Sequence, residues 1–307
     1  YKIQKIKGEA SKRIFYRLNN DKQSIICMDS SNDNNEYENY LKIHSYLKNL
    51  NISIPVIYER ISSCSVLLME DFGELRFDKI LKKYKLNNLL DSAVKTLINL
   101  RNNIDYDNSY DLIKYDFNIF KSEISEFFQY YEYKNGNSIP SELELEFYEI
   151  WEQYFNSLAF DFNTLVHKDF NINNLIYLPL RKGHLKCGVI DFQSAFWGES
   201  SWDLFSLLED SRLNFTDEYN DYFINYYYKK TNQQFSFKDF VVKYYMLNCS
   251  RQTRLLGRWV NLAKTLNENF YLDFITTTKQ RLLKGIQVMD NNRIKLIYKK
   301  IMPDLFI

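Results

Sequence analysis

Three polar side chains near the middle of the chain have the types and the order that phosphoryl transfer requires. Residues 167 to 174 read His-Lys-Asp-Phe-Asn-Ile-Asn-Asn, which contains Asp169 and Asn174, and Asp191 follows the next apolar stretch. A carboxylate such as Asp169 can accept the proton of an attacking hydroxyl group. An amide oxygen and a second carboxylate suit Mg²⁺, which prefers oxygen ligands. Because phosphoryl transfer depends mainly on positioning and charge stabilisation, these residues predict a kinase that uses ATP and Mg²⁺.

The sequence around these residues predicts a β-hairpin that brings two of them together. Residues 175 to 178 are apolar and strand-like, residues 179 to 186 contain the Pro and Gly of a turn, and residues 185 to 190 form a return strand. Because a hairpin folds back on itself, Asp191 should return next to Asn174. The alternative is that residues 167 to 174 form an ordinary hydrogen-bonded turn, since Asn and Asp favour turns.

These motifs resemble those of the aminoglycoside phosphotransferase and choline kinase group, whose members are built like protein kinases. Ile190-Asp191-Phe192 is followed by Ala195, Gly198 and Asp203-Leu204, which is similar to the group's I-D-F-x-x-A-x-x-G-x-x-x-x-D-L signature. Within the group, the chain resembles most the bacterial anomeric N-acetylmuramate and N-acetylglucosamine kinases. Their opening pattern, G-[DE]-A-S-x-R-x-[FY]-x-R-[LV], is matched by residues 8 to 18. Further matches are Met28-Asp29, residues 189 to 193 (V-I-D-F-Q), Tyr115-Asp116 with Glu123 and Phe127, and the basic stretch of residues 251 to 258.

The resemblance implies a fold and a role for each matched residue. The fold would be α+β and bilobal like a protein kinase, with a small β-rich nucleotide-binding lobe at residues 1–71. A larger, mainly helical lobe at residues 72–307 would carry catalysis and acceptor binding. Asp169 would be the catalytic base, His167 would brace its loop, and Asn174 and Asp191 would hold Mg²⁺. The residues expected to bind the nucleotide are Gly8, Ser11, Arg13, Met28, Met69 and Glu70.

Two features depart from the protein-kinase pattern. The chain has no G-x-G-x-x-G loop, and Met28 stands about where a kinase places its phosphate-binding lysine. Either this contact is absent or a residue of the opening segment replaces it; the candidates are Lys12, Arg13 and Arg17, and we expect Arg13. Without the lysine, the acids that open the next helix, Glu36 and Glu38, are more often solvated first-turn residues.

An Asp-Phe-Gly triplet at residues 71 to 73 lies in the wrong place to hold the metal. It precedes His167, whereas the metal-binding triplet of a kinase should follow it. Residues 66 to 69 form a buried-strand pattern that ends at Glu70, which predicts the hinge between two lobes. Backbone groups of residues 68 to 70 would then contact the nucleotide base. The alternative is a plain connection from a strand to a helix.

The acceptor site is less clearly marked than the nucleotide site. Arg251, Arg254 and Arg258 share one helix face because their spacings are three and four. Such a face would repel a polycationic aminoglycoside, and arginine suits a carboxylated sugar. The alternative is a solvated basic face. The other residues that could contact a sugar are Glu123, Asp116, Trp197 and Trp259.

Composition limits the function classes. The chain has 307 residues, a formal charge of +1 and no apolar run of membrane-spanning length. We therefore expect a cytoplasmic enzyme without a nucleic-acid or membrane partner. The motifs and the resemblance imply that its partners are ATP and a small hydroxylated metabolite. The expected reaction is phosphorylation of an N-acetylated amino sugar at its anomeric hydroxyl group. The alternatives are a choline, amino-alcohol or aminoglycoside kinase, or a catalytically weak pseudokinase that binds nucleotide.

Overall fold

The computed structural model describes residues 2–6, 13–20, 22–104, 106–107, 109–213, 216–231 and 233–307. The expected nucleotide contacts of Gly8 and Ser11 lie outside the described residues. The chain packs as two compact units, residues 1–112 with 165–196 and residues 113–164 with 197–307. The expected division at residue 71 into a nucleotide-binding lobe and a catalytic lobe stays a prediction.

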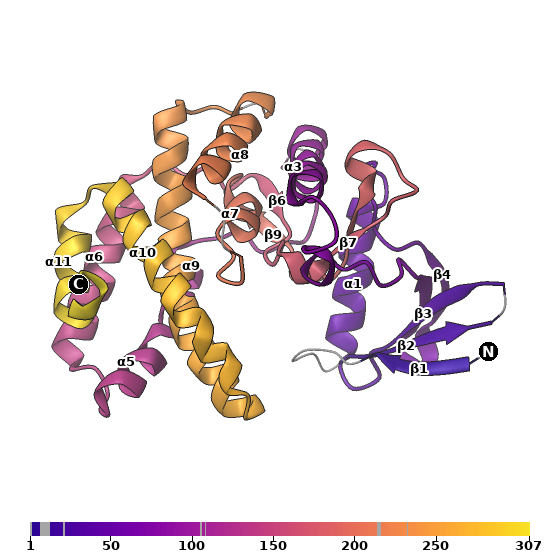
Figure 1. Ribbon diagram of the computed structural model, residues 1–307, viewed down its shortest axis with the longest axis horizontal. Helices are drawn as coiled ribbons and strands as arrows, with labels where there is room; N and C mark the ends of the chain where they lie inside the picture. Colours follow the sequence, from indigo (N-terminus) through magenta and orange to yellow (C-terminus); the bar gives the residue numbers. More distant parts are fainter. Residues whose placement is uncertain are drawn as a thin grey trace. The chain divides into compact units, whose positions relative to one another are not determined.

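A five-stranded antiparallel sheet opens the first unit, in the order β1-β2-β3-β5-β4 (Figure 1). Its strands are β1 (Lys2–Ile6), β2 (Ile14–Asn19), β3 (Ser24–Asp29), β4 (Ile57–Ile61) and β5 (Val66–Glu70). In the β2–β3 pair, Phe15 lies opposite Met28. The predicted buried strand is β5, which lies between β3 and β4 and buries Leu67 and Met69.

Helix α1 (Asn34–Leu47) follows β3 and begins at an acidic cap. The side chain of Asp33 accepts a hydrogen bond from Glu36 N at 3.2 Å, which satisfies one of the unpaired N–H groups of the first turn. The buried face includes Tyr40 and His44. The His44 ring is packed in the core with Nε2 2.9 Å from Pro55 O, so it is a structural histidine.

The rest of the first unit positions the hairpin predicted from the sequence. Helices α2 (Phe77–Ile80) and α3 (Leu86–Asn103) precede it. Strands β7 (Leu175–Tyr177) and β8 (Cys187–Val189) pair antiparallel, with Leu175 opposite Val189. A short 3₁₀ turn at Gly183–Lys186 occupies the start of the expected return strand. The Ile190 N–H donates to Asn174 O at 3.1 Å, so Asp191 returns next to Asn174 as predicted.

The second unit is mainly helical. Its helices are α4 (Phe117–Ile124), α5 (Phe127–Asn135), α6 (Ser141–Ser157), α7 (Trp202–Leu208), α8 (Asp217–Lys230), α9 (Phe237–Leu266), α10 (Phe274–Met289) and α11 (Asn292–Ile301). The long helix α9 packs against α5 and α10 (Figure 1). Gly257 permits close contact with the start of α5, because an added Cβ would lie 1.6 Å from Glu126 O.

The order of elements agrees with the α+β class expected from the sequence: a β-rich beginning is followed by a mainly helical chain. Two short strands, β6 (Thr164–Val166) and β9 (Phe196–Gly198), form a separate two-stranded sheet within the helical part of the sequence. None of the helices in the described ranges combines the length and apolar character that a membrane span requires.

Candidate functional site

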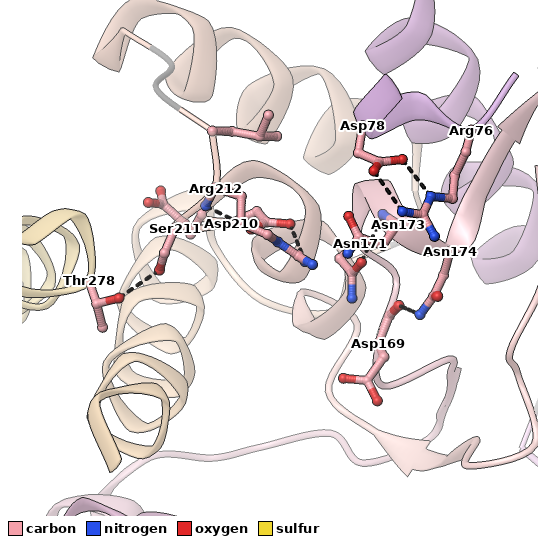
Figure 2. Close-up of polar contacts among 12 residues, drawn as sticks. Arg76, Asp78, Asp169, Asn171, Asn173, Asn174, Asp210, Ser211, Arg212 and Thr278 are labelled. Atoms are coloured by element: carbon pink, nitrogen blue, oxygen red, sulfur yellow. Dashed lines mark hydrogen bonds and ion pairs between the residues drawn. The ribbon is translucent and has the colours of Figure 1, made fainter. Parts of the chain in front are cut away.

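Asp169 lies on the loop after β6, and the loop is held by its own polar groups. The Asn171 N–H donates to Asp169 O at 2.8 Å, and the Asn171 side chain accepts from Asn173 N at 3.0 Å. Lys168 has φ of 81°, a left-handed conformation that is strained for a residue with a Cβ and is concentrated at functional sites. Figure 2 shows the Asp169 carboxylate directed away from Asn171 and Asn174. The carboxylate is therefore oriented to meet a group outside this loop.

His167, at the beginning of this loop, contacts the backbone at the end of the hairpin. It is buried, and its Nε2 lies 3.0 Å from Ile190 O, next to Asp191. Burial lowers the pKa of His167, although the nearby Asp169 carboxylate and the Ile190 carbonyl act in the opposite direction. A neutral imidazole can donate its single N–H to Ile190 O, and this bond ties the beginning of the loop to the end of the hairpin. The bracing role that the resemblance implies for His167 would use this contact, and that role stays a prediction.

Asn174 and Asp191 together offer two oxygen ligands for a hard cation. Asn174 Nδ2 donates to Asp169 O at 2.9 Å, which leaves Oδ1 as the ligand atom of its amide. Asp191 has φ of 66°, and its Oδ1 accepts from Gln193 Nε2 at 3.1 Å. Gln193 Oε1 is buried without a hydrogen-bond partner among the described residues. A metal-bound water could donate the missing hydrogen bond to it. One carboxylate, one amide and several waters fit Mg²⁺, which relies on substrate phosphates for further ligands.

Arg13 pairs directly with one member of this pair. Its Nη2 lies 2.5 Å from Asp191 Oδ1, and its Nε lies 3.1 Å from Glu36 Oε2 on α1. Its guanidinium also lies over the Phe15 ring, 5.5 Å from the centroid. The expectation that Glu36 is simply solvated is therefore wrong, because an arginine replaces the missing lysine as its partner. Glu38 is exposed, as expected.

Met28 cannot take part in charge recognition. Its side chain is completely buried, and it lies opposite Phe15 in the β2–β3 pair. Cross-strand partners in an antiparallel sheet point to the same face, and residues two apart on one strand also share a face. Arg13 and Phe15 of the β2 segment are thus on the same face as Met28. This geometry explains how an arginine that precedes β2 reaches the region where a kinase lysine on β3 would lie.

The segment expected to be the hinge is already hydrogen-bonded within the protein. The Glu70 N–H donates to Val56 O at 2.8 Å, and Glu70 Oε1 pairs with Arg181 Nη2 at 2.5 Å. Met69 is buried, and its sulfur accepts from Tyr40 Oη at 3.5 Å. Any contact with a nucleotide base would have to use other backbone groups of this segment, so the hinge contact stays a prediction.

The Asp-Phe-Gly triplet at residues 71 to 73 has a structural role in this protein. Asp71 accepts hydrogen bonds from Arg17 Nε at 2.6 Å, from Ser24 Oγ and from Gly73 N at 2.8 Å. Burial raises the pKa of Asp71, but these hydrogen bonds and the Arg17 charge outweigh it and leave the pKa below its usual value. Arg17 therefore stabilises the Asp71 carboxylate, and the expectation that Arg13 rather than Arg17 contacts the phosphates stays a prediction.

Of the residues expected to bind the acceptor in the second unit, Glu123 and Arg254 pair with each other, whereas Asp116 and Arg251 contact other residues. Tyr115 Oη donates to Glu123 Oε2 at 3.0 Å, and Arg254 Nη1 lies 3.7 Å from Glu123 Oε1. Asp116 caps α4 by accepting from Ile119 N at 2.9 Å. Arg251 is only 8% exposed and lies near the buried carboxylate of Asp210. The solvated basic face is therefore the wrong interpretation for Arg251 and Arg254.

Neither tryptophan considered for sugar stacking presents a ring face to solvent. Trp259 donates from Nε1 to Thr278 Oγ1 at 3.0 Å and packs with Tyr271 at 6.2 Å between ring centroids. Trp197 is 1% exposed. The expectation that one of these rings stacks on a sugar is corrected: in this structure both rings are core side chains, because they are large and apolar enough to fill the space between packed elements.

Comparison with known proteins places these motifs in a family. The model described as "Phosphotransferase enzyme family" (APH) matches residues 2–235, a range that includes the loop of Asp169, the hairpin and Asp191. The chain belongs to the phosphotransferase enzyme family. The family consists of kinases that act on small molecules, and this membership confirms that the chain is an enzyme of the phosphotransferase class.

Individual relatives of this phosphotransferase are distant. It is 22% identical to N-acetylmuramate/N-acetylglucosamine kinase of Caulobacter vibrioides over 87% of the chain and 83% of the relative. It is 26% identical to the kinase of the same name from Neisseria meningitidis over 68% of the chain and 61% of the relative. Among solved structures, choline kinase LicA from Streptococcus pneumoniae matches with a TM-score of 0.63 at 15% identity, covering 94% of the chain and 93% of LicA.

A second solved structure confirms the protein-kinase-like fold class. Spectinomycin phosphotransferase APH(9)-Ia, solved with ADP and spectinomycin, matches with a TM-score of 0.58 at 13% identity, covering 96% of the chain and 92% of that protein. At such low identity, both structural matches show the fold alone.

Two contacts near the site of this phosphotransferase could not be found from the sequence. Gln193 holds Asp191 Oδ1, and its only signal is its place in the V-I-D-F-Q motif. Arg181, in the hairpin turn, binds Glu70 and lies 5.1 Å from the centroid of the Phe72 ring. The turn contains several basic residues, and nothing in their spacing indicates which of them forms an ion pair with Glu70.

Proposed function

We propose that this phosphotransferase transfers the terminal phosphoryl group of ATP to the anomeric hydroxyl group of N-acetylmuramate or N-acetylglucosamine, with the help of Mg²⁺. The observation that carries the transfer is the convergence of Asp169, Asn174 and Asp191 at one end of the β7–β8 hairpin. The choice of sugar is supported by four curated relatives, which share 22–26% identity with the chain and are all named N-acetylmuramate/N-acetylglucosamine kinase.

Each residue of the site has a distinct task in the proposed reaction. The Asp169 carboxylate accepts the proton of the anomeric hydroxyl as its oxygen attacks the phosphorus. Neutral His167 keeps the loop in place through Ile190 O and transfers no proton. Asn174 Oδ1 and the Asp191 carboxylate would hold Mg²⁺, which neutralises charge on the phosphates when bound. Arg13 supplies the positive charge that Met28 cannot supply.

The second unit contains a cluster of polar groups of the kind that binds sugars. Glu123 accepts from Tyr115 and pairs with Arg254, so a carboxylate, a hydroxyl and a guanidinium lie together. Such a set can exchange hydrogen bonds with sugar hydroxyls, and arginine binds carboxylates bidentately. Because Glu123 already compensates Arg254, we expect N-acetylglucosamine to be accepted as well as the carboxylated N-acetylmuramate.

Two other functions are supported by specific observations and are less favoured. A choline or aminoglycoside kinase would have the same fold, as the matched structures do. A pseudokinase is suggested by Met28, but Arg13 compensates this loss by binding Glu36 directly. The curated relatives weigh against the first alternative, and the complete set of Asp169, Asn174 and Asp191 weighs against the second.

An acceptor panel tests the proposal. The purified protein is incubated with ATP and Mg²⁺ and with N-acetylmuramate, N-acetylglucosamine, its 1-O-methyl glycoside, choline or kanamycin, and ADP release is followed. We expect turnover with the two free sugars and none with the glycoside, because its anomeric oxygen carries no proton. Phosphorylation of choline or kanamycin without reaction of either sugar would overturn the sugar assignment and leave the kinase assignment intact.

A further inference from the structure

The carboxylate proposed to bind Mg²⁺ already has a cationic partner in this structure. Asp191 Oδ1 accepts from Arg13 Nη2 at 2.5 Å and from Gln193 Nε2 at 3.1 Å. The Asp191 side chain remains 39% exposed, whereas that of Arg13 is only 3% exposed. A guanidinium that is buried against a carboxylate interacts with it much more strongly than an exposed pair does. Magnesium must therefore bind Asp191 beside, or in place of, an established ion pair.

Arg13 is fixed in this position from its other side. Its Nε pairs with Glu36 Oε2 at 3.1 Å, and Phe15 lies beneath the guanidinium. Arginine keeps its charge at every relevant pH, so this cation cannot be neutralised by losing a proton. A divalent cation that approaches Asp191 alone would share one carboxylate with a permanent positive charge. A metal ion and the Arg13 guanidinium bound to the same carboxylate repel each other. Because the site is partly buried, solvent and salt screen this repulsion poorly.

Nucleotide phosphates would reverse this balance. They bring several negative charges that a guanidinium and a metal ion can share, and arginine forms bidentate bonds to phosphate. We propose that Arg13 makes metal binding conditional on the nucleotide: it keeps divalent cations off Asp191 in the nucleotide-free protein and becomes a phosphate contact when the nucleotide binds. This inference rests on the proposed function, because it takes Asp191 as the metal ligand.

Arg13 differs from the phosphate-binding lysine of protein kinases in its position in the chain. In protein kinases, a lysine on the third strand pairs with a glutamate of the following helix. Here Glu36 of α1 takes that partner role, but the cation comes from the residue just before β2, and it also pairs with Asp191. The same side chain thus connects α1, the sheet and the metal ligand. Loss of Arg13 should change metal affinity and nucleotide affinity in opposite directions.

Metal binding to the nucleotide-free protein tests this directly, with Mn²⁺ as a paramagnetic probe followed by water-proton relaxation. In Arg13→Met we expect Mn²⁺ to bind at least about tenfold more tightly than in the parent protein, because the competing charge is gone. Metal-free ADP should bind at least about tenfold more weakly, because a phosphate contact is lost. Arg13→Lys retains the charge and should show a smaller gain in Mn²⁺ affinity than Arg13→Met.

Two further variants separate the possible outcomes. Arg17→Met is the matched control, since Arg17 lies on β2 and pairs with Asp71 and Glu74 instead; its Mn²⁺ affinity should equal that of the parent. The double variant Arg13→Met/Asp191→Asn should lose the gain. If Asp191→Asn leaves Mn²⁺–ADP binding unchanged, the metal role in the proposed function fails. If Asp191→Asn weakens that binding but Arg13→Met leaves nucleotide-free Mn²⁺ affinity unchanged, only the conditional role of Arg13 is overturned.

Discussion

At the residue scale, the chemistry depends on one carboxylate that the protein leaves directed away from its own loop. Asn171 and Asn174 donate hydrogen bonds to backbone carbonyl groups of residues 169 and 171. In Figure 2 neither residue is bonded to the Asp169 carboxylate. A general base needs such an arrangement, because it must be held in place through other atoms while its carboxylate meets the substrate.

Replacement of this carboxylate by an amide should separate turnover from nucleotide binding. In Asp169→Asn we expect kcat to fall about 10²–10⁴-fold, because proton transfer contributes on this order. The affinity for Mg²⁺–ADP should stay unchanged, since the base contacts the acceptor. Steady-state kinetics and calorimetric titration measure the two quantities. Asp107→Asn, at an exposed carboxylate outside the site, serves as the control, and equal kcat values in the two variants would remove Asp169 as the base.

The buried histidines make a prediction about pH. Burial lowers the pKa of both His44 and His167 below the value of about 6.5 found in an unfolded chain. The unfolded state therefore binds more protons near and below pH 6.5, and these residues contribute stability that is complete above that pH and lost as the pH falls. The urea concentration at the unfolding midpoint should decrease when the pH is lowered from 7.5 to 5.5. The decrease should be smaller in His167→Gln, whose amide can still donate to Ile190 O. An equal fall in parent and variant would show that His167 does not contribute.

At the element scale, the β7–β8 hairpin determines where the metal ligands lie. Asn174 immediately precedes β7, and Asp191 is the second residue after β8, so the strand register sets their separation. Gly188 on β8 packs against the Phe72 ring, where an added Cβ would lie 2.7 Å from Cδ2. This contact is closer than two carbon atoms tolerate, which makes the hairpin sensitive to a single methyl group.

Gly188→Ala should therefore destabilise the protein by about 1–3 kcal/mol, the usual cost of overpacking a core. It should also weaken Mg²⁺–ADP binding, because the hairpin must shift to relieve the contact. Urea unfolding and calorimetry measure the two effects. In the double variant Gly188→Ala/Phe72→Leu the smaller side chain should restore part of both losses, whereas strictly additive effects would mean that Phe72 is not the obstacle.

The hairpin was predictable from the sequence, and the ion pairs were not. Apolar, strand-like runs on either side of a Pro- and Gly-containing turn predicted the hairpin, and the order of the motifs predicted what lies at its ends. The pairing of Arg13 with Glu36 joins the residue before β2 to helix α1, and no local sequence pattern indicates such a contact. Likewise, the spacing of Arg251 and Arg254 established a shared face of α9, but not that other elements bury it. Packing between residues far apart in the sequence determines which charged side chains pair and which are buried. Local patterns in a single sequence do not indicate this packing.

At the scale of the whole molecule, the first compact unit is assembled from two distant pieces of the chain. Residues 165–196 supply the hairpin, which is attached to residues 1–112 by several hydrogen bonds. The Val189 N–H donates to Ser53 O at 2.7 Å, and Thr96 Oγ1 donates to His184 O at 3.0 Å. The nucleotide-binding groups proposed here, Arg13 and Asp191, come from different pieces, so neither piece contains the site.

This division predicts which fragments can bind nucleotide. A fragment of residues 1–112 should not bind Mg²⁺–ADP, because it lacks Asn174 and Asp191 and exposes the apolar surface that the hairpin covers. Residues 1–112 joined to 165–196 by a flexible Gly/Ser linker restore both pieces, and we expect this protein to fold and to bind Mg²⁺–ADP. Heteronuclear NMR spectra and calorimetry would report folding and binding. The same joined protein with Asp191→Asn is the control. Strong Mg²⁺–ADP binding by residues 1–112 alone would show that the nucleotide site is complete without the hairpin, and would contradict the metal role of Asn174 and Asp191.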